Sequence, residues 1–408
     1  MDLQSGKYFW PTTFPDAPSY PAVEQDLNCD VLIIGGGTSG AQCAYYLAGT
    51  DLDVIVVEKQ KVGSGSTASN TSLIQYSGEK MFTDLVKTFG NDYIQRHLYL
   101  LKEAIKEIEA ASQAAEIECE FKLRDTLYAA SSEKDIDRLK KEYEFLKEHH
   151  FELTFLTKED IESKYPFSRD AAIYSYNDAE LNPFRFTHGL FDYAAKKGVR
   201  IFEKTEMTDQ KYDEETERTI ISTMAGHTIS ARYVIFAAGY ENTDIKKEQK
   251  ASFVSTYTVT TNQVDDLSSW YKRTLIWETA RPYFYMRTTT DNRIIIGGLD
   301  ENTTEPEERD KKLIQKKDKL IEQLNSMFPD IKVEAEYYLS AFYGGTSDGI
   351  PIIGKYDKYP KSYFLMGFGD NGTVYSQLLS KIIVREIVEG NSPDMELYLQ
   401  DRPLLQKK

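Results

Sequence analysis

The 408-residue chain is predicted to adopt an α/β fold (α+β over its whole length), and three features of the sequence support this prediction. An apolar strand, a glycine-rich turn and a helix-compatible segment follow one another between Cys29 and Gly49. Residues 83–115 and 131–150 are helical regions, the second with apolar residues at helical spacing. Residues 251–298 contain β-branched and aromatic runs, which indicate antiparallel strands. We therefore expect a parallel sheet in one part of the chain and a mixed or antiparallel sheet in another.

The glycine-rich turn lies in the segment VLIIGGGTSG, which matches the pattern G-x-G-x-x-G through Gly35, Gly37 and Gly40. The first glycine allows a tight turn, the second lets the backbone approach a pyrophosphate, and the third lets the helix pack on the strand. A second strand, DVIVVEK, follows, and Glu58 at its end is placed to accept a hydrogen bond from a ribose hydroxyl. The pattern predicts a Rossmann-like unit that binds a dinucleotide, and it does not by itself distinguish NAD from FAD.

Three other segments have recognisable local patterns. Residues 7–28 are rich in proline and aromatic side chains, and we expect this arm to pack on the surface of the body. The segment TKEDIESKYP has Thr157 and Asp160 at capping-box spacing and stops before Pro166, which predicts a short helix. Residues 310–328 are predicted to form an amphipathic helix whose lysines lie on a solvated face.

Charge and cysteine content narrow the possible partners and location. A net charge of −16 disfavours nucleic acid and anionic membranes as partners. The start of the chain lacks a basic region followed by an apolar one, and no apolar run reaches about 20 residues, so a cytoplasmic location is expected. Cys29, Cys43 and Cys119 are odd in number and not spaced as metal pairs, so we expect reduced packing residues and no metal site.

Four stretches give the dinucleotide prediction a specific family. They are VGSGSTASN (62–70), ARYVIFAAGY (231–240), the strand, glycine-rich turn and helix of YFLMGFGDNGTVYSQLLSKIIVREIV, and the block FYGGTSDGIPIIG (342–354). With the first glycine-rich turn they resemble the FAD-dependent oxidoreductases of the D-amino acid oxidase, glycine oxidase and sarcosine oxidase superfamily. The likeness is nearest to the branch that includes γ-glutamylputrescine oxidase-like proteins.

The resemblance implies two discontinuous domains and a flavin site. The FAD-binding domain would take residues 1–80, 183–250 and 340–408, and the substrate-binding domain residues 81–182 and 251–339. The cofactor-binding positions that carry over are Gly35, Gly37, Thr38, Ser39, Gly40, Glu58, Lys59, Ser66, Thr67, Ser69, Asn70, Met207, Gly239, Gly344, Gly369, Asn371, Gly372 and Thr373. The alternative for individual loop residues is that the turn alone requires them.

The same resemblance implies oxidation of a C–N bond in an amine or N-substituted amino acid. In this superfamily the flavin takes a hydride from the carbon beside the nitrogen, and the imine product hydrolyses. No catalytic side chain is assigned, and oxygen or another acceptor would reoxidise the flavin. Two alternatives stay open: a flavin dehydrogenase of a hydroxy acid or polyol phosphate, and a non-catalytic flavin-binding protein.

The FAD is expected to be bound without a covalent link. Some relatives attach the flavin through a cysteine near the block SAFYGGTSDG or through an early histidine. Here no cysteine follows Cys119, and GSGSTASNTS contains no histidine.

Four residues are candidates for substrate binding. Strand alternation in RPYFYMR puts Tyr283, Tyr285 and Arg287 on one face, where Arg287 would anchor a substrate carboxylate. The alternative is a structural salt bridge at Arg287 and tyrosines in the core. Asp370 stands where glycine oxidase-like relatives have an arginine. This disfavours a free α-amino acid and favours an amine whose remote end is cationic, or a larger N-substituted compound with its carboxylate near Arg287. The alternative is that Asp370 caps the following helix or satisfies turn amides.

Overall fold

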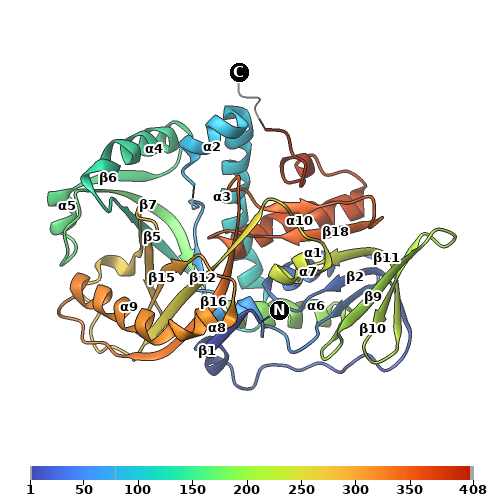
Figure 1. Cartoon of the computed structure of the whole chain (residues 1–408). Helices are drawn as coiled ribbons and strands as arrows, with labels where there is room; N and C mark the ends of the chain where they lie inside the picture. The colour runs from blue at the N-terminus through green and yellow to red at the C-terminus, as the bar shows by residue number, and fades with distance from the viewer. Residues whose placement is uncertain (1, 79, 405–408) are drawn as a thin grey trace.

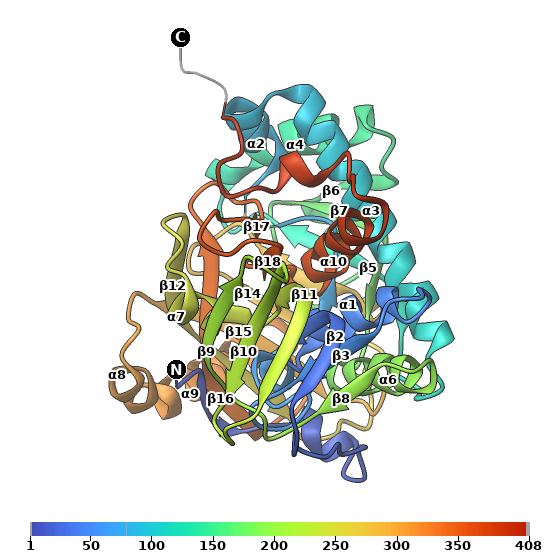
Figure 2. The same cartoon turned by 90° about the vertical axis from the view of Figure 1, so that its right-hand side faces the viewer.

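The computed structural model describes residues 2–78 and 80–404, and two β-sheets organise this part of the chain (Figure 1). One is an 8-stranded sheet with the order β17-β18-β11-β2-β3-β8, to which β10 and then β9 are added beside β11. Its strands are β2 (Leu27–Ile34), β3 (Val54–Val57), β8 (Arg200–Phe202), β9 (Met207–Asp213), β10 (Arg218–Thr223), β11 (Thr228–Phe236), β17 (Ile352–Gly354) and β18 (Ser362–Met366). Figure 2 shows β9, β10, β11, β2 and β3 side by side.

The centre of this sheet is parallel and buried on both faces, as the glycine-rich pattern predicts. Strands β18, β11, β2, β3 and β8 are parallel to one another. Val31 and Ile33 pack on the helical side of the sheet, whereas Leu32 and Ile34 pack on the opposite side. The helices that contribute to the core on the first side are α1 (Thr38–Leu47), α3 (Asn91–Ala114), α6 (Pro183–Lys196) and α10 (Gly372–Glu389). Burial of both faces explains the unbroken apolar run of β2, since buried parallel strands do not alternate.

The second sheet has 10 strands in the order β1-β16-β12-β15-β14-β13-β5-β7-β4, with β6 also paired to β7. Its strands are β1 (Gln4–Lys7), β4 (Leu73–Ile74), β5 (Lys122–Ala129), β6 (Leu153–Thr157), β7 (Ala171–Glu180), β12 (Ala251–Thr261), β13 (Leu275–Glu278), β14 (Phe284–Thr288), β15 (Ile294–Glu301) and β16 (Ala335–Thr346). Neighbours are antiparallel except β5 and β13, which are parallel. The predicted mixed or antiparallel sheet is therefore confirmed.

The predicted helices form, with two differences. Residues 83–115 give two helices, α2 (Phe82–Phe89) and α3, because Gly90 with its positive φ separates them. Lys316 is buried rather than solvated, because it lies on the apolar stripe of α9 (Leu313–Met327), where its ammonium group pairs with Glu301. The remaining helices are α4 (Ile136–Glu148), α5 (Lys158–Glu162), which has the predicted capping box, α7 (Asn242–Ile245) and α8 (Pro306–Lys311).

The N-terminal arm packs on the body as expected. Phe9 and Trp10 are buried, and the indole N–H of Trp10 donates to the carbonyl of Asn70 over 2.6 Å. The amide of Gln4 donates to the carbonyls of Ser64 and Gly65. These contacts hold the arm against the loop around residues 64–70.

The domain ranges given above stay a prediction. Three segments inside the ranges predicted for the FAD-binding domain, β1, β4 and most of β16, pair within the 10-stranded sheet. Within residues 2–78 and 80–404 the model has no helix that is both long and apolar enough to cross a membrane. Cys29, Cys43 and Cys119 are buried and unbridged, as predicted.

Candidate active site

The larger cavity of the site, about 730 Å³, lies at the carboxyl ends of four neighbouring parallel strands. The residues that follow β2, β3, β11 and β18 all contribute to its wall. Ligands of open α/β sheets bind at this edge, and the volume is within the ~300–1,000 Å³ usual for ligand cavities. Thirteen of the predicted cofactor-binding residues line it: Gly35, Gly37, Thr38, Ser39, Glu58, Lys59, Ser66, Thr67, Asn70, Met207, Gly239, Gly372 and Thr373.

Two helices begin on the wall of this cavity. Helix α1 starts at Thr38 and α10 starts at Gly372, and the hydroxyl oxygens of Ser39 and Ser376 are 2.8 Å apart between them. The first turn of a helix has N–H groups without intrahelical partners and a partial positive charge. This end of the cavity therefore suits the pyrophosphate of a dinucleotide.

Glu58 also lines the wall of this cavity. Its Oε2 accepts from the backbone N–H of Gly36 and its Oε1 from that of Gln60, both over 2.7 Å. Burial raises the pKa of Glu58, and these two hydrogen bonds lower it. Each carboxylate oxygen keeps a second lone pair, so Glu58 can still accept a hydrogen bond from a ribose hydroxyl.

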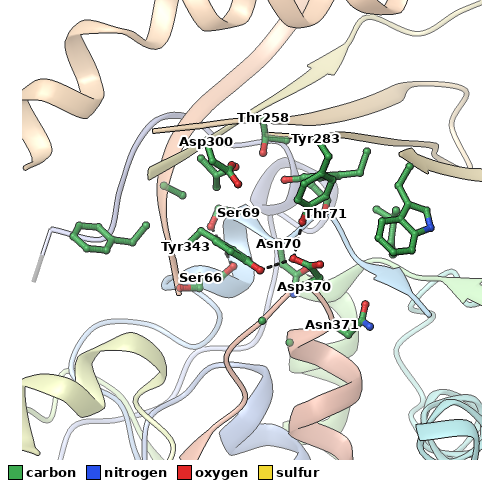
Figure 3. A pocket seen from close by; sticks show the side chains of 18 of the residues that line it. Ser66, Ser69, Asn70, Thr71, Thr258, Tyr283, Asp300, Tyr343, Asp370 and Asn371 are labelled. Carbon is green, nitrogen blue, oxygen red and sulfur yellow. Dashed lines mark hydrogen bonds between the residues drawn. The ribbon is translucent and has the colours of Figure 1, made fainter. Parts of the chain in front are cut away.

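A smaller cavity of about 130 Å³ adjoins the larger one (Figure 3). The two share Ser66, Asn70, Tyr240 and Gly372. The rest of its wall comes mainly from the 10-stranded sheet and from the turn before α10, and includes Thr256, Thr258, Tyr283, Tyr285, Asp300, Tyr343 and Asp370. A molecule in the smaller cavity would therefore contact whatever occupies the adjoining end of the larger one.

Asp370 presents an unsatisfied carboxylate oxygen in this smaller cavity. Its Oδ1 accepts from the hydroxyl of Tyr283 over 2.6 Å and from the hydroxyl of Tyr343. Its Oδ2 is buried and has no hydrogen-bond partner among the described residues. Burial raises the pKa of Asp370, while the two tyrosine hydroxyls and the charge of Arg281 lower it. No side-chain hydrogen bond caps α10, whose N-cap residue is Asn371, so the helix-capping alternative is not supported.

Asp300 is a second carboxylate on the same wall, and it is partly buried. It comes from β15, and burial raises its pKa to about 6, which a hydrogen bond with Thr256 opposes. Among the described residues that line the cavity there is no lysine, arginine or histidine. Arg281 lies outside the wall, with its guanidinium 4.7 Å from the centre of the Tyr283 ring. The smaller cavity is thus acidic and aromatic.

Tyr283 and Tyr285 line the smaller cavity as strand alternation predicts, and their contact with a substrate stays a prediction. Tyr285 lies directly opposite Gly297 of the neighbouring strand β15. A Cβ atom at Gly297 would be 2.4 Å from the Tyr285 hydroxyl oxygen, so only glycine leaves room for this ring.

The expected role of Arg287 as a carboxylate anchor is wrong. Its guanidinium is 3.4 Å from Glu180 and donates to the carbonyls of Thr71 and Leu181, and it also contacts Trp10. The side chain is 2% exposed and does not line either cavity, because the 66–74 segment and the N-terminal arm cover it. The structural salt bridge that was the alternative is the arrangement found.

The other predicted cofactor-binding residues lie elsewhere. Ser69, Gly369 and Asn371 line the smaller cavity. Gly40 and Gly344 line neither cavity: a Cβ atom at Gly40 would be 2.0 Å from the carbonyl oxygen of Gly35, and one at Gly344 would be 2.7 Å from the Tyr240 ring. Gly40 therefore lets α1 approach β2, as its place in the motif predicts. Gly344 was expected to lie against the flavin, but the ring of Tyr240 covers it.

Several lining residues were missed by sequence reasoning. Asp300, Gln75 and Trp277 come from segments without a local motif for a binding site, and Tyr343 comes from the motif block at 342–354 but was not singled out. The available signals were weak: Asp300 follows two glycines at the end of a strand, and Tyr343 lies inside the block FYGGTSDG.

A cavity at the carboxyl ends of parallel strands, with two helix N-termini on its wall, suits a dinucleotide. The FAD dependent oxidoreductase family matches residues 30–386, and the chain belongs to this family. The larger cavity fits FAD, with helix N-termini for the pyrophosphate and Glu58 for the ribose.

Individual relatives are distant. Gamma-glutamylputrescine oxidoreductase of Escherichia coli (strain K12) is 22% identical over 98% of this chain and 92% of its own. A protein of Bacillus subtilis (strain 168) with Rieske 2Fe-2S iron-sulfur protein in its name is 27% identical over 56% of this chain, which spans only 43% of that relative. The crystal structure of glycine oxidase from Geobacillus kaustophilus has a TM-score of 0.73 at 20% identity, covering 90% of this chain and 95% of its own. This last likeness establishes the fold.

Proposed function

We propose that this FAD-dependent oxidoreductase oxidises the C–N bond of an amine. The observation that carries the proposal is that Asp300 and Asp370 both line a cavity whose described wall has no cationic side chain. Carboxylates attract a substrate ammonium and repel a substrate carboxylate or phosphate. The surrounding aromatic faces attract cations as well. The names of the relatives, an oxidoreductase of gamma-glutamylputrescine and a glycine oxidase, agree with nitrogen-containing substrates.

The chain's own residues would bind and orient both molecules. We assign FAD to the larger cavity, with the first turns of α1 and α10 beside its pyrophosphate and Glu58 at its ribose. When bound, FAD supplies a hydride acceptor for the carbon beside the amine nitrogen. Asp370 Oδ2 would accept an N–H of the substrate and take the proton that the ammonium must lose before its carbon can give up a hydride.

The atoms and electrons then balance as follows. The neutral amine loses a hydride, that is one proton and two electrons, and becomes an iminium ion, which water hydrolyses to a carbonyl compound and ammonium or a smaller amine. Oxygen, which would be reduced to hydrogen peroxide, or another two-electron acceptor would take up the two electrons. Either acceptor is compatible with the proposal.

We also propose a cytoplasmic location without nucleic acid or membrane partners. The net charge of −16 supports this, because it repels polyanions and anionic lipids.

The test is an anaerobic titration of the purified yellow protein with amines, amino acids, hydroxy acids and polyol phosphates, followed by flavin absorbance. Bleaching by amines alone is expected. Bleaching by a hydroxy acid or polyol phosphate alone, or by no compound, would favour one of the two alternative functions.

The Asp370→Asn variant sharpens this test. Loss of one charge-assisted hydrogen bond should slow flavin reduction by a cationic amine about 10- to 100-fold. The matched control is Asp318→Asn, at a carboxylate 67% exposed on α9, which should reduce its flavin at the unaltered rate. Equal rates for Asp370→Asn and the unaltered protein would refute the role of Asp370.

A further inference from the structure

Three polar atoms in the wall of the smaller cavity lack hydrogen-bond partners among the described residues. They are Asp370 Oδ2, Gln75 Oε1 and Trp277 Nε1. Gln75 and Trp277 are 4% and 3% exposed, so bulk water does not satisfy them. Unpartnered buried polar atoms are rare in native proteins, and a bound ligand is one explanation for them. Two of the three atoms are acceptors, so the ligand must bring several N–H or O–H donors.

The two carboxylates of this wall come from different elements. Asp370 belongs to the turn before α10, next to Gly369 and Gly372, and Gly372 also lines the FAD cavity. Asp300 belongs to β15 of the 10-stranded sheet. Figure 3 shows Asp300 coming from the strands above and Asp370 from the turn below, with the Tyr343 side chain between them in this view. Asp370 therefore lies beside the larger cavity, and Asp300 lies on the 10-stranded sheet.

Two partly buried carboxylates in one small cavity repel each other, and the charge of Asp370 is among the causes that raise the pKa of Asp300. The cations that act on them, Arg281 on both and Lys316 on Asp300, lie outside the wall. A ligand with a single ammonium would neutralise one carboxylate and leave the other without an ionic partner. A ligand with two separated ammonium groups would neutralise both.

We propose that the substrate is a diamine-type dication, whose reacting nitrogen lies at Asp370 and whose distal ammonium is bound by Asp300. This inference rests on the proposed amine oxidation and deepens it by naming the substrate class. Gln75 Oε1 accepts a further N–H of the bound dication. Asp300 is then a specificity-determining residue that contacts the substrate without taking part in the hydride transfer.

The experiment compares substrates of matched size on the unaltered holoenzyme. Diaminopropane, diaminobutane and diaminopentane, each with an amine at both ends, are set against butylamine, pentylamine and hexylamine. Anaerobic stopped-flow measurement of flavin reduction separates the apparent dissociation constant from the limiting rate. We expect the best diamine to have an apparent dissociation constant at least about tenfold lower than its monoamine partner, with limiting rates within about threefold.

The Asp300→Asn variant locates the distal site. It should raise the dissociation constant of the diamine at least about tenfold and that of the monoamine much less, so that the preference for the diamine is lost, whereas Asp318→Asn should change neither. If diamines and monoamines bind equally to the unaltered protein, the inference is wrong while amine oxidation stands. If diamines are preferred and Asp300→Asn keeps that preference, the assignment of Asp300 is wrong. If no amine reduces the flavin, the proposed function itself fails.

Discussion

Arg287 of β14 and Glu180 of β7 form an ion pair where the 10-stranded sheet packs against the 66–74 segment, which lines both cavities. Their side chains are 2% and 1% exposed, and Arg287 also donates to the carbonyl of Thr71 in that loop. A buried guanidinium with such partners positions the backbone. Because Arg287 does not reach the wall of the smaller cavity, it does not contact a molecule bound there.

Replacement of Arg287 should therefore change stability rather than specificity. We expect Arg287→Ala to lower the free energy of unfolding by about 3 kcal/mol, because the carbonyls of Thr71 and Leu181 would lose their donor and Glu180 would keep only its ion pair with Arg124. Urea denaturation measures this loss. The control is Arg232→Ala, which breaks the more exposed pair with Asp30 and should cost at most about 1 kcal/mol. A selective rise in KM for carboxylate-bearing substrates would restore the anchor role that the structure contradicts.

At the scale of elements, the pairing of β14 with β15 shapes the smaller cavity. Gly297 of β15 leaves the space that the ring of Tyr285 fills from β14. The ring lies on the cavity wall for this reason, and so one strand's glycine fixes the position of a side chain in the next strand.

The Gly297→Ala variant tests this arrangement. The added methyl group must displace the Tyr285 ring, which should cost about 1–3 kcal/mol of stability and weaken substrate binding. The second substitution Tyr285→Ala should return most of the lost stability, because the clash is then gone, but it should not restore binding. A double-mutant cycle measures the coupling, and strictly additive losses would show that the two residues do not interact.

At the scale of the whole molecule, the larger cavity, to which we assign FAD, is lined by loops from many parts of the sequence. The N-terminal residues Asp2, Leu3, Gln4 and Tyr8 add to this enclosure. Non-covalent binding to the folded state stabilises that state by mass action.

We expect acid precipitation to release all yellow colour into the supernatant. Adding FAD to the cofactor-free protein should raise the unfolding temperature, with a stabilisation of about 2.7 kcal/mol at a free FAD concentration 100 times the dissociation constant. Thermal scans over a series of FAD concentrations measure this. Colour that stays in the precipitate would demonstrate a covalent flavin link.

Local patterns in the sequence predicted the elements that line the cavity to which we assign FAD. The glycines of the first turn, the buried strand before it and Glu58 after the second strand lie within about thirty residues, and their spacing alone carries the geometry of a dinucleotide site. The capping box at Thr157 and Asp160 is equally local and forms as predicted. Short-range hydrogen bonds and steric limits fix such features, and both are visible in sequence.

Only the tertiary structure decided which side chains meet around the substrate. Tyr283 precedes β14, Tyr343 belongs to β16 and Asp370 to the turn before α10, and no local pattern brings them together. Strand alternation put Arg287 on the same face as Tyr283 and Tyr285, but the packing of the 66–74 segment and Glu180 decided that Arg287 is covered. Lys316 is buried for the same reason, because Glu301 of a distant strand pairs with it. Contacts between remote segments set burial and charge pairing, and these determine which polar groups remain for a substrate.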